Sequence, residues 1–129
     1  MQLLAEVDLA DFAQVQAVEL AYGRKRALEI ATTLATEPEL MLLDEPTQGM
    51  GHEDVDKVTQ LIKKVSANRT VLMVEHNMGV VSQIADTISV LQRGQIIAEG
   101  PYSLVSTDPL VLEAYMGSAQ QNLESAHAH

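Results

Sequence analysis

One run of seven residues, 40–46, constrains the fold of this chain more than any other feature. It reads Leu-Met-Leu-Leu-Asp-Glu-Pro, and four consecutive apolar residues favour a strand buried on both faces, as in a parallel sheet. Ligands of open α/β sheets bind just beyond the carboxyl ends of the strands. Asp44 would there suit holding Mg²⁺ and Glu45 would suit polarising a water molecule. The alternative is a core strand that ends in two solvated acids.

A second apolar strand is predicted over residues 70–76, which read Thr-Val-Leu-Met-Val-Glu-His, and a helix is predicted over 53–67 between the two strands. A strand–helix–strand unit makes the strands parallel, so that their carboxyl ends lie side by side. His76 is then expected beside Glu45, where a neutral imidazole can link a water or a phosphate oxygen to the carboxylate. A histidine satisfied by a backbone carbonyl is the alternative, but the neighbouring carboxylates favour the functional interpretation.

Residues 20–26 read Leu-Ala-Tyr-Gly-Arg-Lys-Arg and precede a helix that Pro38 ends. The pattern predicts a glycine turn at a helix N-terminus, where free backbone N–H groups can receive an anion. Three basic residues at this end are unfavourable because the N-terminal end of the helix dipole is also positive. A phosphate-bearing ligand would offset this repulsion. On these residues alone, a surface basic cluster paired with acids elsewhere is the simpler interpretation.

The remaining segments predict supporting structure. Residues 1–9 carry a short amphipathic helix, and Asn77 suits the cap of a helix that reaches residue 85. Residues 86–91 and 95–100 form two antiparallel strands joined by a turn at Arg93 and Gly94. Short helices begin at Pro101 and Pro109, and residues 118–129 are expected to form a flexible tail.

Composition narrows the classes of function. The 129 residues suit one domain. The net charge of −10 argues against binding of nucleic acid and against direct binding to anionic lipid. No apolar run approaches the roughly 20 residues of a membrane span, so any membrane role is expected to go through a partner protein. The chain has no cysteine, which excludes disulfides and thiolate chemistry and suits a reducing cytoplasm.

The motifs resemble those of the ATP-binding-cassette (ABC) ATPases. Residues 40–46 resemble the Walker B strand with its catalytic glutamate, residues 47–52 take the place of the D-loop, and His76 resembles the switch histidine. The segment at 20–24 is similar to the signature loop, whose usual form is Leu-Ser-Gly-Gly-Gln. Tyr22 matches the branched-chain amino-acid importer branch of the family, as does the segment 113–117.

The resemblance implies an α/β fold: a partial P-loop NTPase-like (ABC ATPase) domain with a parallel βαβ core, a C-terminal antiparallel hairpin and short helices. It implies that Asp44 holds Mg²⁺, that Glu45 acts on the attacking water and that His76 contacts the γ-phosphate of ATP. The signature residues that would face the ATP of the opposite subunit are Leu20, Ala21, Tyr22, Gly23 and Arg24.

Two departures weaken the signature. Ala21 replaces a serine whose hydroxyl contacts the γ-phosphate in the family, and Arg24 replaces a glutamine. The chain also contains no Gly-x-x-x-x-Gly-Lys-Ser/Thr sequence, the loop that holds ATP phosphates. We therefore expect the isolated chain to bind ATP weakly or not at all, which leaves open whether it is an enzyme by itself.

The expected organisation is the C-terminal half of a nucleotide-binding domain over residues 1–117. Residues 1–36 would be a remnant of the helical subdomain with the signature, and residues 37–117 would hold Walker B, the D-loop region, the switch histidine and the hairpin. Apolar sheet surface left uncovered by the missing half should drive self-association or binding of a separate N-terminal half. The family also implies a membrane-spanning transporter subunit as a partner, and a cytoplasmic position at the inner membrane.

Three interpretations remain. The chain is an ATPase component of an importer, or a non-catalytic interaction or oligomerisation module that keeps the ABC architecture, or a piece of a longer subunit.

Overall fold

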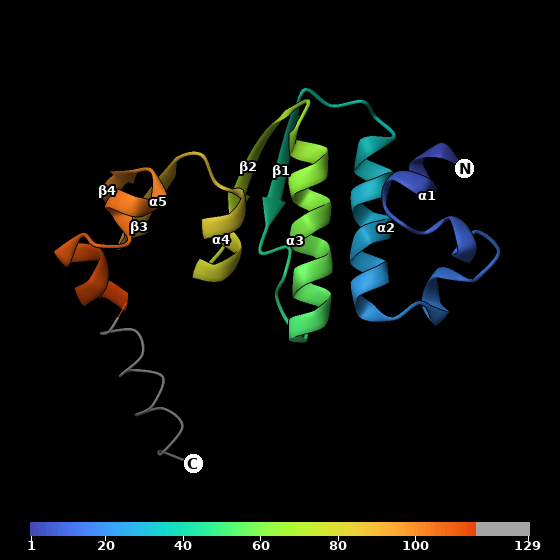
Figure 1. Cartoon of the computed structure of the whole chain (residues 1–129), viewed down its shortest axis with the longest axis horizontal. Coiled ribbons are helices and arrows are strands. Elements are labelled where there is room, and N and C mark those ends of the chain that lie inside the picture. The colour runs from blue at the N-terminus through green and yellow to red at the C-terminus, as the bar shows by residue number, and fades with distance from the viewer. Residues whose placement is uncertain (116–129) are drawn as a thin grey trace, which may run out of the picture. The chain divides into compact units, whose positions relative to one another are not determined.

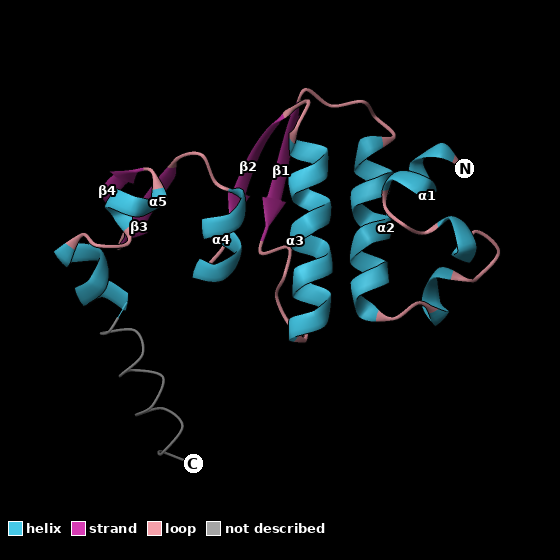
Figure 2. Cartoon of the chain, in the orientation of Figure 1, coloured by secondary structure: helices cyan, strands magenta, loops and turns pink. Residues whose placement is uncertain are grey.

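The computed structural model describes residues 1–115; the expected flexible tail, residues 118–129, lies outside them. The elements form two compact units, one spanning Met1–Ile84 and one beginning at Ala85 (Figures 1 and 2). The first unit contains α1 (Gln2–Glu6), the 3-10 turns η1 (Ala10–Phe12) and η2 (Ala17–Glu19), α2 (Tyr22–Leu34), β1 (Leu40–Asp44), α3 (His52–Ser66), β2 (Thr70–Val74) and α4 (Met78–Ile84). The second contains β3 (Ile88–Gln92), β4 (Gln95–Gly100) and α5 (Tyr102–Val105).

The first unit is built on two parallel strands. β1 pairs with β2 in a register that sets Leu40 opposite Thr70 and Asp44 opposite Val74, which confirms the predicted parallel pairing. The connecting helix α3 has Glu53 and Asp54 in its first turn and Lys63 and Lys64 in its last, so charges complement the helix dipole at both ends. The α/β fold with a parallel βαβ core is therefore as the sequence predicts.

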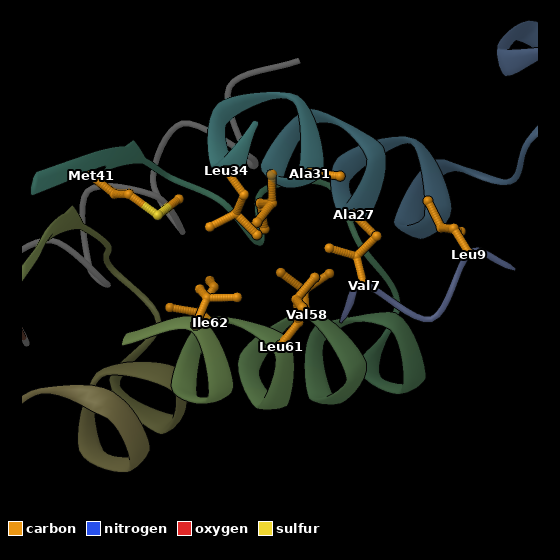
Figure 3. Close-up of a cluster of buried hydrophobic side chains, with 11 residues drawn as sticks. Val7, Leu9, Ala27, Ala31, Leu34, Met41, Val58, Leu61 and Ile62 are labelled. Atoms are coloured by element: carbon orange, nitrogen blue, oxygen red, sulfur yellow. The ribbon is translucent and has the colours of Figure 1, made fainter. Parts of the chain in front are cut away.

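The core of this unit lies where α2, α3 and one face of the sheet meet. Figure 3 shows Ala27, Ala31 and Leu34 of α2 pointing toward Val58, Leu61 and Ile62 of α3, with Met41 of β1 beside them. Ile62 is fully buried, and Met41 is only 1% exposed. Val7 and Leu9, which follow α1, complete the cluster. The fold therefore rests on aliphatic packing of two helices against one side of a two-stranded sheet.

The opposite face of the sheet is exposed, and the expectation of strands buried on both faces is wrong for this chain. The exposed side chains alternate with the core-facing ones along both strands: Leu40, Leu42, Leu72 and Val74. Leu42 is 68% exposed and Leu72 is 61% exposed. Four apolar residues in a row suit a strand with two covered faces, but the described residues supply a helical layer for only one of them. We call these four residues the open sheet face.

Helix α2 begins earlier than the sequence indicates. It starts at Tyr22, so Gly23 and the three basic residues that follow lie in its first turns rather than in a preceding loop. Gly23 is buried because α3 passes close by: a Cβ at Gly23 would lie 2.7 Å from Cγ of Asp54. A side chain there would collide with the start of α3, which explains why glycine is tolerated inside this helix.

The second unit is an antiparallel hairpin followed by short helices. β3 and β4 pair from Ile88 opposite Gly100 to Gln92 opposite Gln95, with an irregularity in register between Val90 and Leu91. Arg93 and Gly94 both have positive φ, as a tight two-residue hairpin turn requires. The predicted hairpin is confirmed, and α5 and a helical segment from residue 109 follow it. No helix in the described residues is long and apolar enough to span a bilayer.

Candidate functional site

Glu45 follows β1 directly and has an unusual backbone conformation. Its φ is +43°, a region that favours glycine, and the residue is held there from both sides. Its N–H donates to the carbonyl of Val74 at 2.8 Å, and its carbonyl accepts from the N–H of Gln48 at 3.1 Å. Non-glycine residues in such conformations cluster at functional sites, where the surrounding structure enforces them. The bonds turn the chain sharply and fix where the Glu45 side chain begins.

The structure places His76 against Glu45. Nδ1 of the imidazole lies 3.3 Å from Oε1 of Glu45, and the two side chains are 70% and 35% exposed. The contact joins the ends of two neighbouring parallel strands, which is where the sequence pattern locates it. A carboxylate and an imidazole in contact and open to solvent can together bind a water and take a proton from it.

Glu75, one residue before His76, is the site residue that sequence analysis missed. Its Oε1 accepts hydrogen bonds from the backbone N–H of Thr47 at 3.1 Å and from the Thr47 hydroxyl. Its Oε2 accepts from the N–H of His76 at 3.1 Å and from the N–H of Asn77 at 3.2 Å. Thr47 lies 28 residues away in sequence, so no local pattern indicates the contact.

These hydrogen bonds favour the ionised form of Glu75. Burial raises the pKa of its carboxyl, but the bonds from the Thr47 hydroxyl and from the backbone N–H groups of Asn77, Thr47 and His76 outweigh it. The pKa therefore lies below the ordinary value of 4.5. At neutral pH the half-buried Glu75 is a carboxylate whose two oxygens are each shared by two donors.

Asp44 is the last residue of β1, and its side chain is exposed. A carboxylate at a strand end is a ligand type that Mg²⁺ accepts, and Mg²⁺ commonly takes one or two carboxylates and completes its shell with water and substrate phosphates. Within residues 1–115, no group of three or more His, Cys, Asp or Glu side chains is arranged to hold a metal ion. Asp44 thus fits a single protein ligand of Mg²⁺ rather than a complete protein cage.

The predicted signature residues 20–24 lie at the start of α2, with Leu20 buried and Tyr22 52% exposed. Ala21 is the N-cap and has no side-chain oxygen to accept from the first N–H groups of the helix. The guanidinium of Arg24 lies over the ring of Phe12, 4.1 Å from its centroid. Two residues on, Arg26 pairs with Glu29 at 2.6 Å, so that part of the basic cluster has an acidic partner.

The loop that follows β1 supports the site. Pro46 and Thr47 are both buried, and Gly49 has a φ of +75°. His52, which the sequence pattern places in the loop 47–52, is the first residue of α3 and is exposed. Asn77 caps α4 as predicted, because its Oδ1 accepts from the N–H groups of Gly79 at 3.0 Å and Val80 at 3.3 Å. The two loops beyond the strands are therefore both held by side-chain hydrogen bonds.

Known proteins match the chain over nearly its whole length. It is 41% identical over 118 residues to the high-affinity branched-chain amino acid transport ATP-binding protein BraF of Pseudomonas aeruginosa. It is 37% identical over 118 residues to the corresponding LivG protein of Escherichia coli. Both alignments cover 90% of this chain and 46% of the relative, so the chain spans about half the length of these curated relatives.

A family model and a solved structure agree with these matches. The model described as "ABC transporter" matches residues 1–48. The ADP conformation of MJ1267, an ATP-binding cassette of an ABC transporter, superposes with a TM-score of 0.82 at 30% identity, covering 90% of this chain and 48% of that chain. By its motifs, its fold and these similarities, the chain is similar to the ATP-binding proteins of ABC transporters over about half of their length.

Proposed function

We propose that this chain is the hydrolytic half of the ATP-binding subunit of an ABC importer for branched-chain amino acids. The contact between Glu45 and His76 at 3.3 Å supports the proposal most directly, because it unites a carboxylate and an imidazole at adjacent strand ends. The names of the relatives in Pseudomonas aeruginosa and Escherichia coli support the class of transported solute.

The chain's own residues would divide the work at this site. Glu45 would accept a proton from the attacking water, and His76 would hold its imidazole against Glu45 and contact the γ-phosphate. Asp44 would supply one carboxylate ligand to Mg²⁺. When bound, ATP would supply the transferable phosphoryl group and Mg²⁺ would neutralise its charge. Because the sequence lacks the Gly-x-x-x-x-Gly-Lys loop, the grip on the phosphates has to come from elsewhere.

The segment at 20–24 would serve a second ATP, held by the opposite subunit. Helix α2 begins there, and the N–H groups of its first turn have no partners within the helix, which suits an anion. Ala21 cannot offer the serine hydroxyl of the usual signature, so backbone groups near Gly23 would carry this contact. The proposal therefore includes a weakened signature.

The open sheet face supports the part of the proposal that concerns partners. Leu40, Leu42, Leu72 and Val74 form an apolar surface on a sheet with only two strands in the described residues. The N-terminal half of a cassette, or a second copy of this chain, would cover it. Residues 1–117 would then be the C-terminal half of the domain. This domain would lie in the cytoplasm and bind a membrane-spanning subunit.

Release of phosphate from ATP tests this proposal. The 129-residue chain is mixed with the half of BraF that it does not match, which should contain the phosphate-binding loop, and hydrolysis of Mg-ATP is measured. We expect hydrolysis only in the mixture, and we expect Glu45→Gln to lower kcat by about 10²- to 10⁴-fold, the usual contribution of a general base. Glu53→Gln, at the exposed start of α3, is the matched control and should leave the rate unchanged. Equal rates for wild type and Glu45→Gln would refute the catalytic role.

A non-catalytic interaction module is the second candidate. The replacement of the signature serine by Ala21 and of the glutamine by Arg24 favours it, as does the absent phosphate-binding loop. An equilibrium titration with Mg-ATP separates the two candidates. Binding by the mixture of halves supports the ATPase component, and no binding at millimolar ATP supports the interaction module.

A further inference from the structure

Glu75 connects the two loops that hold the candidate catalytic pair. One of its oxygens, Oε1, takes both donors from Thr47, in the loop after β1. The other oxygen, Oε2, takes the N–H groups of His76 and Asn77, in the turn after β2. Each oxygen thus serves one loop, and the carboxylate forms a bridge between them.

This bridge closes a short ring that contains the site. Pro46 is the one residue between Glu45 and Thr47, and Glu75 is the direct neighbour of His76. The ring runs from Glu45 through Pro46 to Thr47, across the hydrogen bonds to Glu75, along the chain to His76, and across the 3.3 Å contact back to Glu45. The proline ring fixes φ at Pro46, and Thr47 is buried, so few torsions in the ring are free.

We propose that Glu75 is a positioning residue that holds Glu45 and His76 at their contact distance by joining the loops after β1 and β2. The geometric part of the proposal stands on the hydrogen bonds alone, and its effect on catalysis rests on the proposed function. Glu75 itself accepts hydrogen bonds from the two loops, and we propose no contact between Glu75 and ATP.

The arrangement calls for a carboxylate rather than an amide. Four donor groups converge on two oxygens, and a glutamine of the same size has only one oxygen. In Glu75→Gln the amide NH₂ has to face one of the two loops, and the donors of that loop lose their acceptor. We therefore expect the isosteric substitution to release one loop while the other remains attached.

Hydrogen exchange on the 129-residue chain tests the bridge without any nucleotide. In Glu75→Gln, the backbone N–H groups of one loop, either Thr47 or His76 with Asn77, should exchange at least about tenfold faster than in wild type, because bonds to charged acceptors are the stronger kind. Glu75→Ala should accelerate all three. Glu99→Gln is the matched control, because Glu99 is an exposed carboxylate that accepts from Ser89 at 2.6 Å in the other unit. Unchanged exchange at all three amides in both Glu75 variants would overturn the proposal.

Thr47 tests the same bridge from its other end, should the Glu75 variants fail to fold. Thr47→Val keeps the size of the side chain and the backbone N–H but removes the hydroxyl donor, and Thr47→Ser keeps the hydroxyl. Faster exchange at Thr47 in the valine variant, with wild-type exchange in the serine variant, supports the bridge. Equal exchange in both variants overturns the part assigned to the hydroxyl bond.

The catalytic consequence is measured in the mixture with the BraF half. If wild type hydrolyses ATP, Glu75→Gln should lower kcat by at least about tenfold with KM for ATP little changed, because the residue acts through Glu45 and His76. A rise in KM at constant kcat, or no change in either, would overturn the positioning role. If wild type itself is inactive, the proposed function fails, while the exchange measurements still decide whether the bridge exists.

Discussion

We predict that the open sheet face drives assembly, and two substitutions test this prediction. Leu42→Thr and Leu72→Thr change neighbouring residues of β1 and β2 that pair in register and are 68% and 61% exposed. Threonine suits strands as well as leucine does, so the sheet should persist. Because only about a third of each side chain is buried, we expect a cost of about 0.5–1 kcal/mol in folding stability for each change.

The effect on association should be larger. Complete burial of a leucine is worth about 1.5–3 kcal/mol, so covering the exposed two thirds would contribute about 1–2 kcal/mol per residue. The double variant should then weaken binding by about 2–4 kcal/mol, or about 30- to 1000-fold in Kd. Sedimentation equilibrium over a concentration series measures self-association, and a fluorescence titration measures binding to the BraF half.

Two controls separate assembly from folding. Val18→Thr changes a residue that is 74% exposed in η2, outside the sheet, and should leave both affinities unchanged. Met41→Thr alters the covered face of β1 and should destabilise the fold itself, since Met41 is 1% exposed. The reasoning is refuted if Leu42→Thr with Leu72→Thr associates as tightly as wild type, or if wild type neither self-associates nor binds the other half.

Three further predictions concern stability. Ala21→Ser adds an N-cap oxygen where the backbone is already extended, with ψ at 154°, and urea unfolding should show a gain of about 0.5–2 kcal/mol. Ile62→Ala empties a fully buried site in the core and should lose about 2–5 kcal/mol in the same assay. The folded-state pKa of Glu75 is lowered, so its contribution to stability is complete above the ordinary 4.5 and disappears as pH falls through the folded value. Unfolding from about pH 6 downward should therefore show a smaller acid-dependent loss in Glu75→Gln than in wild type.

Local patterns in the sequence were sufficient for much of the fold. Apolar runs, helical spacing and turn residues lie within short windows, so the strands at 40–44 and 70–74 and the helix between them could be predicted from the residues. A strand–helix–strand connection then makes the strands parallel, which is why the meeting of Glu45 and His76 followed from the sequence. The catalytic roles of the two residues stay a prediction.

Other features depended on how distant segments pack. Helix α2 includes Gly23 because a neighbouring helix fills the space beside it, and a one-dimensional pattern contains no such neighbour. An apolar strand shows that its faces suit burial, but the layers actually present decide which face is covered, and Leu42 remains exposed. The bridge from Glu75 to Thr47 joins residues 28 positions apart, and it exists only because the parallel strands bring their following loops together. The sequence by itself determined the elements and the end of the sheet where the acid and the imidazole meet, and the tertiary structure decided what covers the sheet and what holds that pair in place.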